Sequence, residues 1–193
     1  MKVIVRELFE TVILALLIFL GLHSSLQHFQ IDGYSMHPTL EAGDHIIVNK
    51  LVYMNFESRQ LTKLLPFVEL DENHSLFPFH PPRQGEVVIF SLPDDKSRDF
   101  IKRVIGVPGD VVELREGQLL VNGVELDEPY VVQRNLITME PVYVDEDTFF
   151  VLGDNRSASN DSRDWGPVPS KNIIGRAWVS FWPFHSLHAF SGF

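Results

Sequence analysis

A long apolar run near the amino terminus, residues 8–26, limits what the rest of this chain can be. Glu10 and Thr11 interrupt the run, and it becomes more polar from His23 onwards. A helix that crosses a membrane needs about 20 mostly apolar residues. Because the apolar residues occupy every side of the helix rather than one stripe, a buried core helix is the poorer interpretation. We therefore expect a membrane anchor, with membrane lipid as its partner.

A cleavable signal peptide is the alternative, because the most apolar part of the run, residues 12–22, is short. No small-x-small cleavage site follows Leu22, which favours an uncleaved anchor. Lys2 and Arg6 precede the run, whereas the next basic residue is Lys50. The positive-inside rule then predicts a single-pass protein of the plasma membrane, with a cytoplasmic amino terminus and an extracytoplasmic remainder.

Beyond the anchor, apolar and polar residues alternate with period two, which is typical of strands. Strands are predicted over residues 45–52, 86–92, 99–107, 110–116, 118–123, 148–154 and 173–182. Gly-containing dipeptides at 116–117 and 122–123 supply the positive φ of tight hairpin turns. We predict an anchor unit over residues 1–28 and a second, β-rich domain over residues 29–193. The predicted fold class is mainly β: a single N-terminal transmembrane helix, then a mostly antiparallel, barrel-like sheet or two packed sheets.

Two stretches show no clean period, residues 53–84 and residues 127–147. The first is rich in Pro and aromatic residues and is predicted to be a long irregular insertion. The aromatic segment 181–190 fits a last strand and a tail packed on the core, which we favour. The alternative for this segment is a surface that rests on lipid.

Composition excludes several function classes. With a net charge of −10, the chain is a poor partner for nucleic acid, whose phosphates require clustered Lys and Arg. The absence of cysteine excludes disulfides, thiolate zinc sites and cysteine nucleophiles. His185 and His188 are spaced like metal ligands on a helix, but packing or exposure to solvent is the favoured interpretation. We expect no nucleic-acid partner, no metal and no cofactor, with a monomer as the default oligomeric state.

The segment IDGYSMHPTL, residues 31–40, places Ser35 between Tyr34 and Met36. A serine hydroxyl is a nucleophile only when a base removes its proton. His37 lies two positions away, but an extended backbone does not place it to accept that proton, and no local Ser-His-Asp signature occurs.

Lysine is the other base that can serve a nucleophilic serine, provided that burial lowers its pKa. In a strand at 99–107, Lys102 lies between two hydrophobic residues on one face, and Arg103 does so on the other. Because arginine stays protonated, Lys102 is the candidate for a buried neutral base. An exposed Lys102, or one whose ammonium reaches solvent over its neighbours, fits this pattern equally well.

The segment GDNRSASNDSRDWG, residues 153–166, follows a predicted strand and is rich in Asp, Asn and Ser. Its simplest interpretation is a polar loop whose side chains bond to their own backbone. The alternating D-x-D-x-D-G pattern of a calcium loop is missing. The functional interpretation is a loop that orients a catalytic group.

In this order behind one apolar anchor, GYSMHPTL, FIKRVIGVPGD and GDNRSASNDSR resemble the three signature boxes of type I signal peptidases, the bacterial leader peptidases. The resemblance frames residues 31–182 and leaves 53–84 and 127–147 unmatched. It implies a membrane-bound serine endopeptidase with a Ser-Lys dyad and an acyl-enzyme. Its substrates would be exported preproteins, cut after signal peptides with small residues one and three positions before the bond.

The resemblance also implies a role for each matching residue. Ser35 matches the nucleophile and Lys102 the general base. Some members carry a serine that assists the oxyanion hole where this chain, like other members, has Gly33. Oxyanion stabilisation would then rest on backbone N–H groups, that of Ser35 first.

Four further residues match supporting positions of the family. Ser159 matches a serine whose hydroxyl helps to hold the lysine. Asp154 and Arg163 match a charged pair that braces the site, and Arg103 follows the base as in the family.

Two other functions stay open at this point. The first is a related Ser-Lys protease that cleaves itself, as the SOS repressors do; the anchor and the lack of an amino-terminal DNA-binding domain count against it. The second is an anchored β module that binds exported chains without cutting them, which the presence of both Ser35 and Lys102 disfavours.

Overall fold

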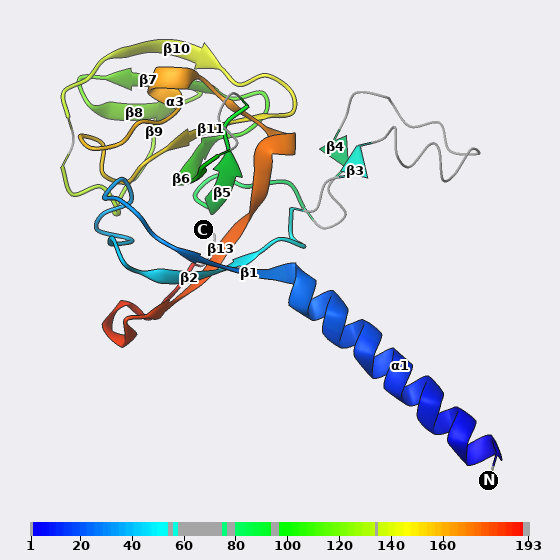
Figure 1. Cartoon of the computed structure of the whole chain (residues 1–193). Helices are drawn as coiled ribbons and strands as arrows, with labels where there is room; N and C mark the ends of the chain where they lie inside the picture. Colours follow the sequence, from blue (N-terminus) through cyan, green and yellow to red (C-terminus); the bar gives the residue numbers. More distant parts are fainter. Residues whose placement is uncertain are drawn as a thin grey trace, which may run out of the picture.

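The structure is a computed structural model that describes residues 2–53, 56–57, 75–76, 80–93, 97–133 and 135–190. Most of the predicted insertion at 53–84 lies outside these residues. One long helix, α1 (Lys2–Ser25), projects from a β-rich body (Figure 1). Among the described residues, no helix has both the length and the apolar character of a membrane-crossing segment.

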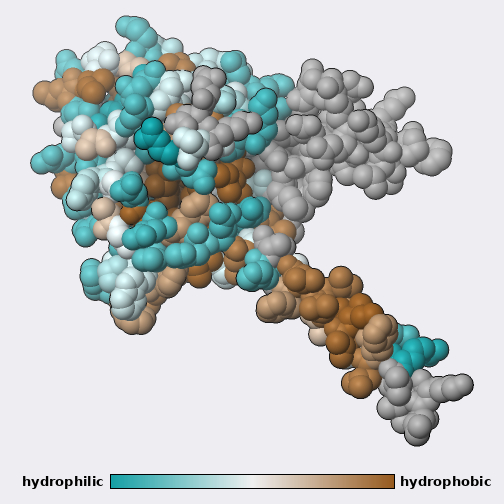
Figure 2. Space-filling model, in the orientation of Figure 1, coloured by the Kyte–Doolittle hydropathy of each residue, from teal (hydrophilic) through white to brown (hydrophobic). Residues whose placement is uncertain are grey.

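The apolar side chains of α1 are exposed on all sides of the helix. Those with 40–65% of their surface exposed are Leu8, Phe9, Val12, Ile13, Leu14, Leu16, Leu17, Ile18, Phe19 and Leu20. Figure 2 shows them as an apolar rod beside a more polar body. The helix ends at Ser25, and strand β1 starts at Leu26, before the boundary that the sequence placed at residue 28. The strand starts there because its residues pair with β2.

The body consists of antiparallel strands in curled sheets (Figure 1). The main sheet has the order β1 (Leu26–Gln30), β2 (His45–Asn49), β13 (Ile173–Trp182), β5 (Val87–Ser91), β6 (Asp99–Gly106), β11 (Thr148–Leu152) and β12 (Val168–Pro169), with β14 (His188–Ala189) on β13. A second sheet has the order β10 (Met139–Tyr143), β7 (Val111–Arg115), β8 (Gln118–Val121) and β9 (Val124–Glu125). The pair β3 (Phe56–Glu57) and β4 (Ser75–Leu76) is separate. Short helical turns are α3 (Ser162–Trp165), η1 (Ser170–Asn172) and η2 (Phe184–Ser186).

All the strands predicted from period two are present, and so are the two hairpin turns. Glu116 and Gly117 have φ of 50° and 83° between β7 and β8, and Asn122 and Gly123 have φ of 54° and 77° between β8 and β9. The sequence missed β10, inside the stretch 127–147. Its alternation is interrupted at a bulge that contains Pro141, so the strand shows no clean period.

In the described part of the chain, the buried hydrophobic side chains form three clusters, and strand β6 supplies a fully buried residue to two of them. Val104 packs in the cluster that contains Phe149, whereas Ile105 packs in the cluster that contains Phe150. Because neighbouring residues of a strand point to opposite faces, β6 is covered on both sides. Any polar residue in the middle of this strand is therefore buried, whichever face it occupies.

Candidate functional site

The loop that carries Ser35 is fixed by apolar residues on either side of it. Ile31, Met36 and Leu40 are buried in the same cluster, and the Leu40 amide donates to the Met36 carbonyl at 2.9 Å. Between these anchors Ser35 is half-buried and Tyr34 is exposed. The loop thus holds its serine at the edge of the core, where the hydroxyl has access both to buried groups and to solvent.

Lys102 brings its side chain to this serine from strand β6. Its Nζ lies 2.8 Å from Ser35 Oγ and 3.0 Å from the Ile101 carbonyl oxygen. Only 3% of its surface is exposed. Of the two interpretations that the sequence left open, the structure therefore selects a buried Lys102.

The surroundings of Lys102 favour its neutral form. Burial lowers its pKa to about 8 and outweighs the opposite effects of the Asp161 and Asp154 carboxylates. The positive charge of Arg163 adds to the lowering. A lysine with this pKa is partly deprotonated near neutral pH, and the deprotonated amine is chemically able to accept a proton from a hydroxyl.

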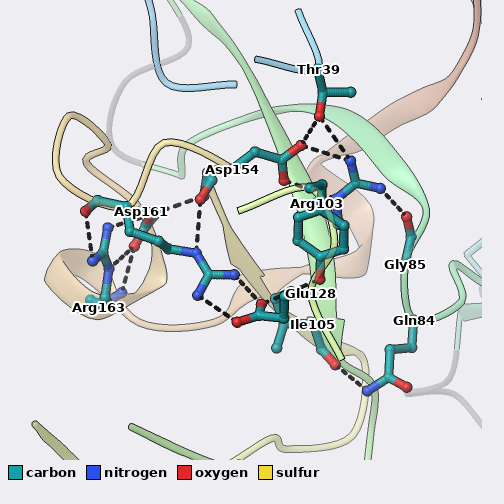
Figure 3. A network of polar contacts seen from close by, with 12 residues as sticks. Thr39, Gln84, Gly85, Arg103, Ile105, Glu128, Asp154, Asp161 and Arg163 are labelled. Atoms are coloured by element: carbon teal, nitrogen blue, oxygen red, sulfur yellow. Dashed lines mark hydrogen bonds and ion pairs between the residues drawn. The ribbon is translucent and has the colours of Figure 1, made fainter. Parts of the chain in front are cut away.

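Arg103, the next residue of β6, is also buried, and a buried carboxylate binds its guanidinium. Its Nε and Nη2 donate to Asp154 Oδ1 and Oδ2 at 2.9 and 2.7 Å, and its Nη1 donates to the Gly85 carbonyl at 2.8 Å (Figure 3). Thr39 Oγ1 donates to the same carboxylate at 2.5 Å. Through this contact, the loop that carries Ser35 is joined to the Arg103–Asp154 ion pair.

The start of the 153–166 segment holds the backbone of the serine loop. The Asn155 amide donates to the Ser35 carbonyl at 3.0 Å, and its side-chain Nδ2 donates to the Tyr34 carbonyl at 3.1 Å. A Cβ at Gly153 would collide with the Ser35 carbonyl and with Ser159 Oγ. Glycine is therefore required at position 153 by close approach of the two segments.

The charged pairs differ from the one that the sequence predicted. Asp154 binds Arg103, and Arg163 binds Asp161 through contacts of 2.7 Å and 2.8 Å (Figure 3). The predicted Asp154–Arg163 pair is therefore wrong. The reason is the register of β6 and β11, which places Arg103 opposite Leu152 and so beside the carboxylate that follows that strand.

Two other predicted supporting residues have less defined contacts. Ser159 Oγ is buried against Gly153 and has no hydrogen-bond partner among the described residues. The predicted hydrogen bond from Ser159 to Lys102 is therefore not formed in this structure, and a role of Ser159 in holding the lysine stays a prediction. Gly33 has φ of 108°, a conformation that favours glycine, and its share in an oxyanion hole also stays a prediction.

Sequence reasoning missed Thr39 and Asp161. Asp161 is fully buried, caps α3 and accepts the Gly153 amide at 3.0 Å. A signal for this residue was available, because Asp161 and Asp164 have the spacing of a capping box. Nothing in the local sequence marks Thr39, since its partner lies 115 positions away.

A cavity of about 320 Å³ opens beside the two reacting groups. Its lining combines apolar with polar and charged residues, namely Phe29, Gln30, Ile31, Asp32, Ser35, Ile46, Ile89, Arg98, Asp99, Phe100, Ile101 and Lys102. A larger cavity of about 640 Å³ includes Arg103, His185 and His188 but neither Ser35 nor Lys102. Of these two cavities, the smaller is the one that both Ser35 and Lys102 line. In the described part of the chain, no three His, Asp or Glu residues are grouped to hold a metal.

Comparison with known proteins points in one direction. Residues 4–182 match the family model described as signal peptidase, peptidase S26. A signal peptidase I of Leptolyngbya laminosa is 36% identical over 186 residues, which cover 92% of this chain and 80% of that protein. A signal peptidase I of Bacillus caldolyticus is 34% identical over 171 residues, with coverage of 81% and 80%. The crystal structure of a signal peptidase I from Enterococcus faecalis V583 aligns with a TM-score of 0.45 at 32% identity, covering 50% of this chain and 97% of its own.

Proposed function

Because the chain belongs to the peptidase S26 family of signal peptidases, a family of serine endopeptidases, we propose that it cleaves signal peptides from exported preproteins with Ser35 as nucleophile and Lys102 as general base. The observation that carries the proposal is the 2.8 Å contact between Ser35 Oγ and the Nζ of a buried lysine. The lowered pKa of Lys102, about 8, supports its action as a base.

In the acylation step, neutral Lys102 accepts the Ser35 proton while Oγ attacks the scissile carbonyl carbon. The Ser35 backbone N–H donates to the negatively charged oxygen of the tetrahedral intermediate. The protonated lysine then gives its proton to the leaving amine as the C–N bond breaks. The products of this step are the free mature chain and an ester between Ser35 and the signal peptide.

The ester is hydrolysed by a water molecule that the same base activates. Lys102 accepts a proton from a water molecule whose oxygen attacks the ester carbonyl. When the C–O bond to Ser35 breaks, the lysine returns the proton to Oγ. The enzyme regains its starting state, and the signal peptide leaves as a carboxylate.

The cavity beside the dyad supports a preference for small side chains. The whole cavity is about 320 Å³, and this volume must hold the peptide backbone as well as the side chains near the cut. We infer that residues one and three positions before the scissile bond bind here.

We further propose that α1 attaches the enzyme to the plasma membrane, with the β body on the extracytoplasmic side. The exposed apolar side chains of α1 support membrane attachment, and Lys2 and Arg6 before them support the orientation. Confining enzyme and membrane-tethered substrate to one bilayer raises their effective concentration. A reporter fused after Phe193 is expected to be active only outside the cytoplasm, and cytoplasmic activity would contradict this orientation.

The central test is cleavage of a purified preprotein by the wild type, Ser35→Ala and Lys102→Ala. Both variants are expected to lose nearly all activity while keeping a native circular dichroism spectrum. Full activity in Lys102→Ala would refute the dyad.

A further inference from the structure

A loop behind the site, residues 126–133, makes contacts that the proposed chemistry does not use. It follows β9 and supplies Glu128, whose side chain is fully buried, and Tyr130, which is half-buried. Neither residue lines the cavity that contains Ser35 and Lys102. We call residues 126–133 the rear loop.

Glu128 binds Arg156, which in turn holds the segment that contacts the nucleophile. The carboxylate accepts from both Nη atoms of Arg156, a side chain that is 2% exposed. The Nε of Arg156 donates to the Gly153 carbonyl at 3.0 Å. Gly153 is the residue that packs directly against the Ser35 carbonyl and Ser159. A chain of contacts therefore runs from Glu128 to the backbone of the nucleophile.

Tyr130 connects the same loop to the other half of the site. Its hydroxyl donates to Glu128 Oε1 at 3.3 Å, and the centre of its ring lies 4.0 Å from the guanidinium carbon of Arg103. Arg103 follows Lys102 and binds Asp154. The rear loop thus supports both the strand that carries the base and the segment that holds the nucleophile.

We propose that Glu128 is a positioning residue for the Ser35–Lys102 pair and acts through Arg156 and Gly153. This inference rests on the proposed function of that pair. A buried guanidinium that loses its carboxylate must move toward water or stay uncompensated, and either outcome disturbs its other contacts. Because Gly153 has no free space on the side of Ser35, a displacement of its carbonyl is transmitted to the nucleophile.

Glu128 is expected to act on Lys102 through the position of the 153–166 segment, and not through the charge of its own carboxylate. The charged groups that act on the pKa of Lys102 are Asp161, Asp154 and Arg163. When the 153–166 segment is displaced, water reaches Lys102, and the burial that lowers its pKa is weakened. Loss of Glu128 is therefore expected to raise the pKa of the base.

The first test is the Glu128→Gln variant with a preprotein as substrate. We expect kcat to fall about 10- to 100-fold, because small misplacements of reacting groups have effects of this size. KM is expected to change little, since Glu128 is outside the cavity. The acid limb of the pH profile is expected to move to higher pH. A kcat and an acid limb equal to those of the wild type would overturn the proposal.

Glu113→Gln is the matched control. Glu113 on β7 also binds an arginine through two contacts, 3.0 Å and 2.8 Å to Arg115, and neither Ser35, Lys102 nor Gly153 takes part in these bonds. Its kcat is expected to equal that of the wild type. An equal loss of kcat in Glu113→Gln and Glu128→Gln would show a general effect of the substitution and overturn the proposal.

A second set of variants separates position from stability. In the double variant Glu128→Met with Arg156→Met, no buried charge is left unpaired, so thermal unfolding is expected near that of the wild type. Its kcat is expected to stay as low as that of Arg156→Met alone, because Gly153 has lost its donor in both. Recovery of kcat together with stability would overturn the proposal, even if Glu128→Gln does not fold.

Ser35→Ala distinguishes failure of the inference from failure of the proposed function. If Ser35→Ala retains activity, the dyad itself is refuted. If Ser35→Ala is inactive while Glu128→Gln matches the wild type, only the positioning by Glu128 is refuted.

Discussion

Lys102 Nζ lies 2.8 Å from Ser35 Oγ although 67 positions separate the two residues in the chain. Different parts of the fold fix the two side chains. Ser35 sits in a loop anchored by Met36 and held by Asn155, whereas Lys102 lies in a strand covered on both faces. The contact is therefore held from two sides, and in the proposed mechanism activity then depends on the protonation state of Lys102.

The first prediction concerns the pH dependence of catalysis. The base must be neutral in the free enzyme, and the pKa of Lys102 is lowered to about 8. We therefore expect kcat/KM to rise about tenfold per pH unit on the acid side and to level off above that pKa. Initial rates with one preprotein, measured across buffers of constant ionic strength, check this. A flat profile between about pH 6 and pH 9 would contradict it.

The second prediction concerns stability, which the same pKa shift links to pH. The pKa of Lys102 falls from 10.5 to about 8 on folding, so between these values the unfolded chain holds more protons than the native one. The free energy of unfolding must then rise with pH across this window, and at lower pH the buried lysine costs about 3 kcal/mol.

Lys102→Met removes this cost while keeping an apolar side chain of similar length. The variant is expected to be inactive and, near about pH 7, more stable than the wild type by up to about 3 kcal/mol. The difference should shrink toward zero above about pH 10. Urea unfolding at the two pH values measures it, and a variant less stable than the wild type at neutral pH would refute the linkage.

The third prediction concerns the close approach at Gly153. In Gly153→Ala, the added methyl group meets the Ser35 carbonyl and Ser159 Oγ, so one of the two segments must shift. We expect kcat to fall at least about tenfold and stability to fall by about 1–3 kcal/mol, as in other overpacked sites. Gly21→Ala is the control, because its Cβ has open space. Steady-state kinetics of Gly153→Ala that match those of Gly21→Ala would show that the 153–166 segment does not hold the nucleophile.

The strands of this fold could be predicted because their signal is local. Alternation predicted most of the longer strands, and the dipeptides at 116–117 and 122–123 predicted the two hairpin turns between β7, β8 and β9. The burial of Lys102 could not be predicted, since it depends on which strands cover the two faces of β6. The structure shows that both faces are covered, so Lys102 and Arg103 are 3% and 6% exposed.

Charge pairing shows the same limit. The family resemblance implied a pair of Asp154 with Arg163, but the register of β6 and β11, which joins segments about fifty residues apart, places Asp154 beside Arg103 instead. Asp161 fills the place beside Arg163 because it caps α3. Motifs therefore identified the residues near the site, whereas their contacts required the tertiary fold.

The fourth prediction concerns the proposed attachment of α1 to a membrane. Leu14 and Leu17 are 59% and 61% exposed on this helix. Arginine at the centre of a membrane-inserted helix is unfavourable by about 2.5–3.5 kcal/mol per residue on insertion scales. The double variant Leu14→Arg with Leu17→Arg is therefore expected to shift from the membrane pellet to the supernatant on alkaline carbonate extraction, while the wild type stays in the pellet.

The matched control for this prediction changes two exposed apolar residues of the β body. Val132 and Leu136 are 72% and 84% exposed, and neither belongs to α1. Val132→Arg with Leu136→Arg is expected to remain in the pellet, because the added charge is the same but the helix is intact. If both double variants extract equally, net charge rather than α1 governs the partition. If neither extracts, the apolar faces of α1 do not hold the enzyme at the membrane.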